Sequence, residues 1–174
     1  MINKEIQKLL DDHNSFARQI ANVRLSNLSF DVYEFRDKYV MQVDLIFAEK
    51  SQFDHIQEAF SAIFKKELFD GEEWDINDDP DPSDEQWIKA LADGWINEYY
   101  PKKYICLELV NKDEFRWRFK NELAYLDVTE SIVKELFTRL NHIEAIQLKK
   151  GYTYDYIFGQ SDNHYFLFEW GIYD

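Results

Sequence analysis

The chain has 174 residues, a net charge of −14 and a pI near 4.7. With 45% hydrophobic and 17% aromatic residues it is too apolar for a disordered chain, and its length predicts a single domain spanning residues 1–174. The negative charge argues against binding to nucleic acid or anionic membranes and favours basic partners. A lone cysteine and a charged N-terminal segment without a signal-peptide pattern predict a reducing, cytoplasmic location.

The first part of the chain predicts a helix, a β-hairpin and a second helix. Apolar residues recur at steps of three and four from residue 6 to residue 20, which indicates one helix over about residues 3–22. Two stretches rich in β-formers, 30–35 and 39–47, predict strands joined by a tight turn. A second helix is expected to begin at Ser51 and to end near Gly71.

The segment 70–85 follows, with nine acidic residues and no basic one. Its spacing of oxygen ligands begins like a calcium-binding loop, but Pro80 replaces the required glycine and Gln86 the required glutamate. We therefore expect a solvated or partner-binding loop, with divalent-cation binding as an alternative and no cofactor. The residues predicted to bind a partner in this loop are Glu72, Glu73, Trp74, Asp75, Asp78, Asp79 and Asp81.

The second half of the chain predicts further helices and hairpins. A capping box formed by Ser83 and Gln86 indicates a third helix after Pro82. We then expect strands at 104–110 and 115–119, a fourth helix capped by Asp127, a strand that opens near residue 146 and alternates over 152–158, and a last strand at 165–173.

This order predicts an α+β fold: a mostly antiparallel sheet of about six strands with about four helices packed mainly on one face. The acidic segment separates two possible α-β-β-α units, which allows an internal duplication. No matching residue string supports it.

The sequence carries none of the short motifs of hydrolases, metalloenzymes or nucleotide-binding proteins. Asp44 is the carboxylate to examine, because its strand neighbours are apolar, although an exposed position is expected for it. The basic residues Arg116, Arg118 and Lys120 are predicted to pair with nearby acids rather than to bind nucleic acid. An enzyme without short motifs remains an alternative, and its site would be a pocket of carboxylates with raised pKa values.

The last predicted hairpin is unusually rich in tyrosine, at positions 152, 154 and 156. Such an alternating face either packs in the core or, when exposed, forms a recognition surface. We count Tyr154 and Tyr156 as candidate partner-binding residues.

In composition the chain resembles the small acidic immunity or inhibitor proteins that bacteria make against basic toxins, an analogy of size and charge alone. It predicts a non-enzymatic protein that neutralises a basic partner protein by steric blocking and charge complementarity. The alternatives are a divalent-cation-binding regulatory protein, an enzyme without recognisable motifs, and a homodimer that binds a second copy of itself.

Overall fold

The structure is a computed structural model that describes residues 1–38, 40–70, 83–90 and 106–172. Within these ranges, none of the helices combines the length and the apolar character needed to cross a membrane.

A six-stranded sheet forms the centre of the described chain, and every pair of neighbouring strands is antiparallel. Its order is β1-β2-β6-β5-β4-β3. The strands are β1 (Asp31–Arg36), β2 (Met41–Glu49), β3 (Glu108–Leu109), β4 (Glu144–Lys150), β5 (Tyr154–Gln160) and β6 (His164–Ile172). The predicted α+β class and six-stranded antiparallel sheet are therefore confirmed.

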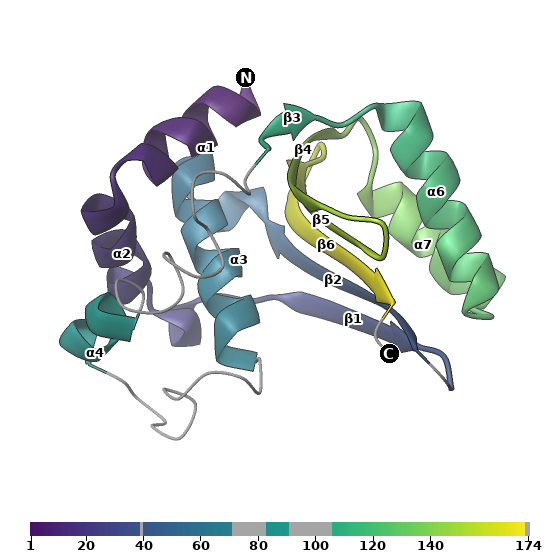
Figure 1. Cartoon of the computed structure of the whole chain (residues 1–174), viewed down its shortest axis with the longest axis horizontal. Helices are drawn as coiled ribbons and strands as arrows, with labels where there is room; N and C mark the ends of the chain where they lie inside the picture. Colours follow the sequence, from purple (N-terminus) through teal and green to yellow (C-terminus); the bar gives the residue numbers. More distant parts are fainter. Residues whose placement is uncertain (39, 71–82, 91–105, 173–174) are drawn as a thin grey trace.

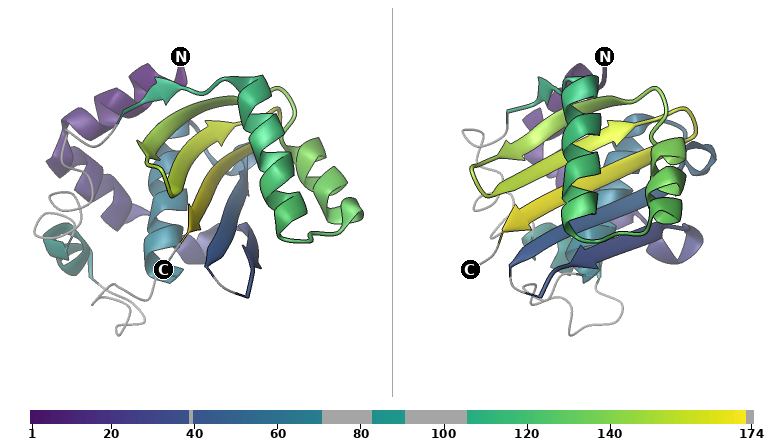
Figure 2. Two further views of the ribbon diagram at one scale, coloured as in Figure 1. Left: turned by 45° about the vertical axis from the view of Figure 1, so that its right-hand side comes forward. Right: turned by 90° about the vertical axis from the view of Figure 1, so that its right-hand side faces the viewer.

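Helices cover both faces of this sheet (Figures 1 and 2). On one face lie α1 (Ile2–Asp11), α2 (His13–Asn22) and α3 (Ile56–Asp70), with α4 (Asp84–Ala90) packed against α2; on the other lie α6 (Lys112–Tyr125) and α7 (Glu130–Arg139). Two short 3₁₀ turns, η1 (Leu25–Asn27) and η2 (Lys50–Gln52), flank the β1–β2 hairpin.

The expectation of helices mainly on one face is therefore wrong, and β2 shows why. Val43, Leu45 and Phe47 of this strand pack towards α6 and α7, whereas Ile46 and Ala48 pack towards the helices of the other face. Because both sets of side chains are buried apolar groups, each face of the sheet needs a helical cover.

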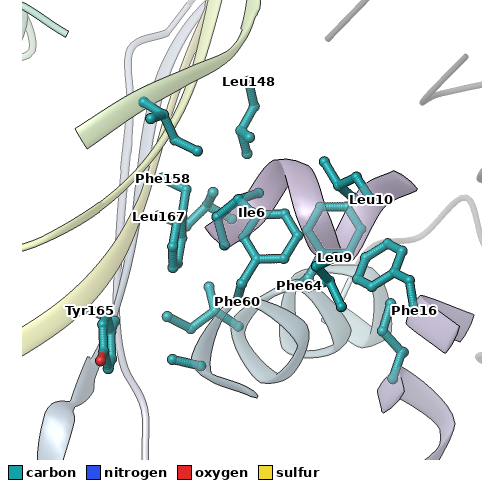
Figure 3. Close-up of a cluster of buried hydrophobic side chains, with 14 of the residues drawn as sticks. Ile6, Leu9, Leu10, Phe16, Phe60, Phe64, Leu148, Phe158, Tyr165 and Leu167 are labelled. Carbon is teal, nitrogen blue, oxygen red and sulfur yellow. The ribbon is translucent and has the colours of Figure 1, made fainter. Parts of the chain in front are cut away.

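Aromatic rings and aliphatic side chains together form the core under α1, α2 and α3 (Figure 3). Phe60 of α3 packs edge-on against Phe158 of β5, with ring centroids 4.9 Å apart, and stacks on Phe64 at 5.4 Å. Phe16 of α2 contacts both rings of α3. This burial fixes α3 over the middle strands of the sheet.

The first predicted helix is two helices, α1 and α2, separated at Asp12. The Asp12 carboxylate accepts a hydrogen bond from the backbone N–H of Ser15, at 3.0 Å, and so caps α2. A short acidic side chain that binds the next turn in this way competes with continuation of the helix. Apolar periodicity alone continues across the break and does not reveal it.

The strand predicted at 115–119 is wrong, because these residues belong to α6. Asn111 caps the helix by accepting hydrogen bonds from the backbone N–H groups of Asp113 and Glu114, each at 3.0 Å. Phe115 and Phe119 are buried while Trp117 is 70% exposed, so the aromatic alternation comes from helical spacing. With a helix here, residues 106–125 do not form the β-hairpin that the possible second α-β-β-α unit requires.

Other boundaries moved by a few residues for local reasons. The second predicted helix begins at Ile56 rather than Ser51, since residues 50–52 form the turn η2. The predicted capping box is confirmed: the Ser83 N–H donates to Gln86 Oε1 at 2.7 Å, and the Gln86 N–H donates to Ser83 Oγ at 3.2 Å. Thr129, rather than Asp127, occupies the N-cap position of α7.

Candidate functional site

The sequence-predicted site residues fall into two groups. The acidic-segment residues Glu72, Glu73, Trp74, Asp75, Asp78, Asp79 and Asp81 lie outside the described residues. The two tyrosines of β5 are described: Tyr154 is 44% exposed and Tyr156 is 9% exposed. Tyr152, which precedes the strand, is fully exposed. The tyrosine-rich hairpin thus has an exposed tip and a buried body.

Buried Tyr156 belongs to a line of polar residues that crosses five strands. Strand pairing places Glu34 opposite Asp44, Asp44 opposite Glu169, Glu169 opposite Tyr156, and Tyr156 opposite Lys149. Directly opposite residues project from the same face of a sheet. We call these five residues the polar row.

The polar row lies on the face covered by α3. Tyr156 and Leu167, two residues before Glu169, both belong to the core packed by α1, α2 and α3. Lys149 reaches this face because a β-bulge between Gln147 and Lys149 shifts the register of β4 against β5. Continuous alternation would have sent Lys149 to the opposite face, since Leu148 already projects into the α3 core.

Glu67 of α3 interacts with residues of the polar row. Burial, and then the neighbouring carboxylate of Glu169, raise the pKa of Glu67 to about 8, against opposing effects of a hydrogen bond with Tyr156 and of the Lys149 charge. Burial lowers the pKa of Lys149, while Glu67 and Glu169 act to raise it. The residues therefore influence one another electrostatically, and Glu67 is mostly protonated at neutral pH.

Asp44 lies between Glu34 and Glu169 in the row. Its side chain is 22% exposed, so it is half-buried rather than on the exposed face that was expected, and burial raises the pKa of its carboxyl group. Arg36 Nη1 donates to Asp44 Oδ1 at 2.5 Å, and Gln42 Nε2 donates to Oδ2 at 3.4 Å. Arg36 thus forms an ion pair with Asp44, the middle one of three carboxylates that strand pairing places opposite one another.

The other face of the sheet holds charge in a different way. Asp155 of β5 is fully buried and forms an ion pair with Arg118 of α6. Gln147 Nε2 donates to Asp155 Oδ1 at 3.1 Å, and the Arg118 guanidinium lies 5.0 Å from the ring centroid of Trp170. The prediction that this basic stripe pairs with nearby acids is right for Arg118. Arg116 instead lies 5.2 Å from the ring centroid of Phe137.

Across the described ranges, no group of three or more histidine, cysteine, aspartate or glutamate side chains is arranged to hold a metal ion. The predicted calcium-type spacing at residues 75–86 falls mostly outside those ranges and stays a prediction.

The fold and the polar row define an α+β protein whose antiparallel sheet lies between two helical layers and carries a charged line on one face. Comparisons with models of known families, with curated proteins and with solved structures found no match to this chain.

Sequence reasoning identified Asp44 and Tyr156 separately and missed Glu34, Glu67, Lys149 and Glu169. The row depends on the register of four strand pairs, and a single sequence gives no measure of register between distant strands. The one local signal is Glu169, an acidic residue within the otherwise apolar run of the last strand.

Proposed function

We propose that the chain is a non-enzymatic, acidic binding protein that neutralises a basic partner protein, in the manner of an immunity or inhibitor protein. The polar row and the acidic segment 70–85 are the surfaces assigned to the partner. The cytoplasm is the proposed place of action. The observation that carries the proposal is the direct opposition of three carboxylates, Glu34, Asp44 and Glu169, across neighbouring strands.

Like charges directly opposite one another in a sheet destabilise it. Within the described residues, Arg36 forms an ion pair with Asp44, and Lys149 lies at the far end of the row beyond Tyr156. A lysine or arginine of a partner placed near the exposed Glu34 would offset part of the repulsion along the row. The cost to the free protein would then be recovered in the complex, and the negative field would accelerate association.

The first test is a pull-down from the native organism's lysate at low salt, eluted with a salt gradient, followed by association kinetics with the purified partner. The row variant carries Glu34→Gln, Asp44→Asn and Glu169→Gln. The control variant carries Glu5→Gln, Asp54→Asn and Glu130→Gln, which removes the same charge at positions outside the row. A third variant replaces Asp75, Asp78, Asp79 and Asp81 by Asn.

We expect the association rate of the row variant to fall by about tenfold, and that of the control by less than about twofold. The segment variant is expected to fall by about tenfold as well if both surfaces contact the partner. Equal rates for the row and control variants would remove the row from the interface. A rate that does not change with ionic strength would contradict the whole electrostatic proposal.

A second candidate function rests on the position of Glu67 beside the carboxylates of the row. A carboxyl group that keeps its proton at neutral pH, as the raised pKa of Glu67 implies, can act as a general acid. Strongly perturbed pKa values also cluster at active sites more often than elsewhere. The same row could therefore serve a hydrolytic enzyme that lacks short sequence motifs.

Chromogenic esters, glycosides and phosphate esters would test this second function. Hydrolysis by the natural chain that is lost in Glu67→Gln and Glu169→Gln, and kept in Glu130→Gln, would favour the enzyme. Hydrolysis that all three variants retain would assign the activity to a contaminant or to another part of the molecule.

A further inference from the structure

A cavity of about 190 Å³ lies on the face of the sheet opposite the polar row, between the N-terminal half of α6 and strands β3, β4 and β5. Its floor consists of buried aromatic and aliphatic side chains, and its mouth carries exposed residues of β3 and α6. The floor residues are Phe115, Phe119, Ile157 and Phe168.

The volume sets the size of the occupant. Small-molecule and cofactor sites usually measure about 300–1,000 Å³, so this cavity is too small for a nucleotide or a typical cofactor. At about 30 Å³ for each water in the liquid, it corresponds to roughly six water molecules. A single long side chain of a partner protein fits this size.

The floor presents three aromatic rings to the occupant. Phe168 lies edge-on to Phe115 and Phe119, with centroid separations of 5.4 Å and 5.6 Å, while Phe115 and Phe119 stack at 5.8 Å. Ring faces attract cations, and the same rings bury the aliphatic stem of a long side chain.

The mouth carries acceptors for a cation. Glu108 and Glu114 are exposed, and neither carboxylate forms an ion pair with any residue in the described ranges. Gln147 is 8% exposed; its Nε2 donates to Asp155, whereas its Oε1 accepts no hydrogen bond from the described part of the chain. The Oε1 atom can therefore accept a hydrogen bond from an occupant of the cavity.

Two cations also line the cavity, and the buried carboxylate of Asp155 balances one of them. Arg118 forms the ion pair with Asp155 and packs against Trp170. The charge of Lys150, which is exposed at the mouth, helps to hold down the pKa of Asp155 against the larger effect of burial. Lys150 therefore offsets one of the two mouth carboxylates, Glu108 and Glu114, and one carboxylate charge is left in excess.

We propose that this cavity is an anchor pocket for one long basic side chain, a lysine or an arginine, of the partner protein. The inference rests on the proposed function and deepens it, because it names the group through which the partner is held. An aromatic floor, an amide oxygen that can accept a hydrogen bond and a mouth with one carboxylate charge in excess together match an aliphatic stem that ends in a cation.

The test is an NMR titration of the full ¹⁵N-labelled chain with three small probes: N-acetyl-arginine amide, N-acetyl-lysine amide and the uncharged N-acetyl-norleucine amide. We expect the two basic probes to bind with millimolar dissociation constants and to shift the amides of Glu108, Glu114 and Ile157. The norleucine probe should bind at least about threefold more weakly, since it lacks the cation.

A matched pair of variants tests the mouth. Glu108→Gln with Glu114→Gln should weaken the binding of the arginine probe by about threefold to tenfold. Glu5→Gln with Glu130→Gln removes the same charge far from the cavity and should leave the binding unchanged. All four positions are exposed, so neither variant threatens folding.

Three results would contradict the anchor pocket. They are no amide shifts near the cavity, an affinity for the norleucine probe equal to that for the basic probes, or the same loss of arginine-probe binding in the mouth variant and the control variant. Shifts restricted to Asp44 and Glu169 would likewise assign the basic group to the polar row. Pocket binding by the probes without salt-sensitive partner capture would refute the proposed function alone. Partner capture that needs the row, with no probe at the pocket, would refute the anchor alone.

Discussion

The two faces of the sheet handle charge in opposite ways. On the α6 face, Asp155 is fully buried, yet Arg118 and Gln147 satisfy it and Trp170 covers the guanidinium. On the α3 face, the carboxylates of Glu34, Asp44 and Glu169 lie in line, half-buried or exposed, with Arg36 as the cation paired with Asp44.

This difference separates charge that the fold requires from charge that the fold tolerates. Removing one partner of a buried ion pair is strongly destabilising, although forming the pair adds little. Like charges that lie directly opposite one another weaken the sheet. Residues of the first kind should respond to mutation in stability, and residues of the second kind in binding.

The largest expected effect comes from Arg118→Met, which leaves Asp155 buried without its cation. We expect a loss of about 3 kcal/mol in the free energy of unfolding at pH 7, measured by urea denaturation. Adding Asp155→Asn to this variant removes the stranded charge and should recover at least half of the loss. Wild-type stability in Arg118→Met would show that the pair is not part of the fold's support.

The next effect concerns Glu67 and pH. The folded pKa of about 8 exceeds the ordinary value of 4.5, so the folded state holds a proton that the unfolded state releases. The stability associated with this proton is complete below pH 4.5 and is lost as the pH rises to about 8 and beyond. Between pH 5 and pH 9, the wild type should lose about 1–3 kcal/mol more than Glu67→Gln.

Urea denaturation at five pH values across this range gives the comparison. Parallel curves for the wild type and Glu67→Gln would mean that Glu67 has an ordinary pKa in the folded state. Direct NMR observation of the Glu67 side-chain carboxyl carbon during the same titration reports that pKa independently.

The smallest effect is a gain. Glu169→Gln removes the central charge of the row, and we expect the free energy of unfolding to rise by about 0.5 kcal/mol at pH 8 and low salt. Because salt screens the repulsion, the gain should shrink at high ionic strength. A destabilised Glu169→Gln variant would instead place Glu169 among the charges that the fold requires.

Much of the fold followed from local patterns in the sequence. The strict alternation of Met41, Val43, Leu45 and Phe47 located β2, and the reciprocal hydrogen bonds of Ser83 and Gln86 were foreseen from residue type and spacing. These features depend on residues close in the chain, which the sequence displays directly.

Two features of the fold could not be predicted from local patterns in the sequence. Phe115, Trp117 and Phe119 alternate like the residues of a strand. The four-residue steps from Phe115 to Phe119 and from Phe119 to Leu123 also fit a helix, and Asn111 caps that helix at its N-terminus. The polar row needed strand register, and the placement of α6 and α7 opposite α1, α2 and α3 needed tertiary packing. Neither is encoded within one segment.

The β-bulge between Gln147 and Lys149 determines which mutations β4 can accept. Leu148 occupies the aromatic core while Lys149 stands opposite Tyr156, so two consecutive side chains serve the same face. Deleting Leu148 would straighten the strand and keep Lys149 and Lys150 opposite Tyr156 and Asp155, with only a hole left in the core. The additional residue therefore lets a single strand supply both a packing group and a charged group. A residue of the polar row can then be substituted while the strand pairing of the sheet stays the same.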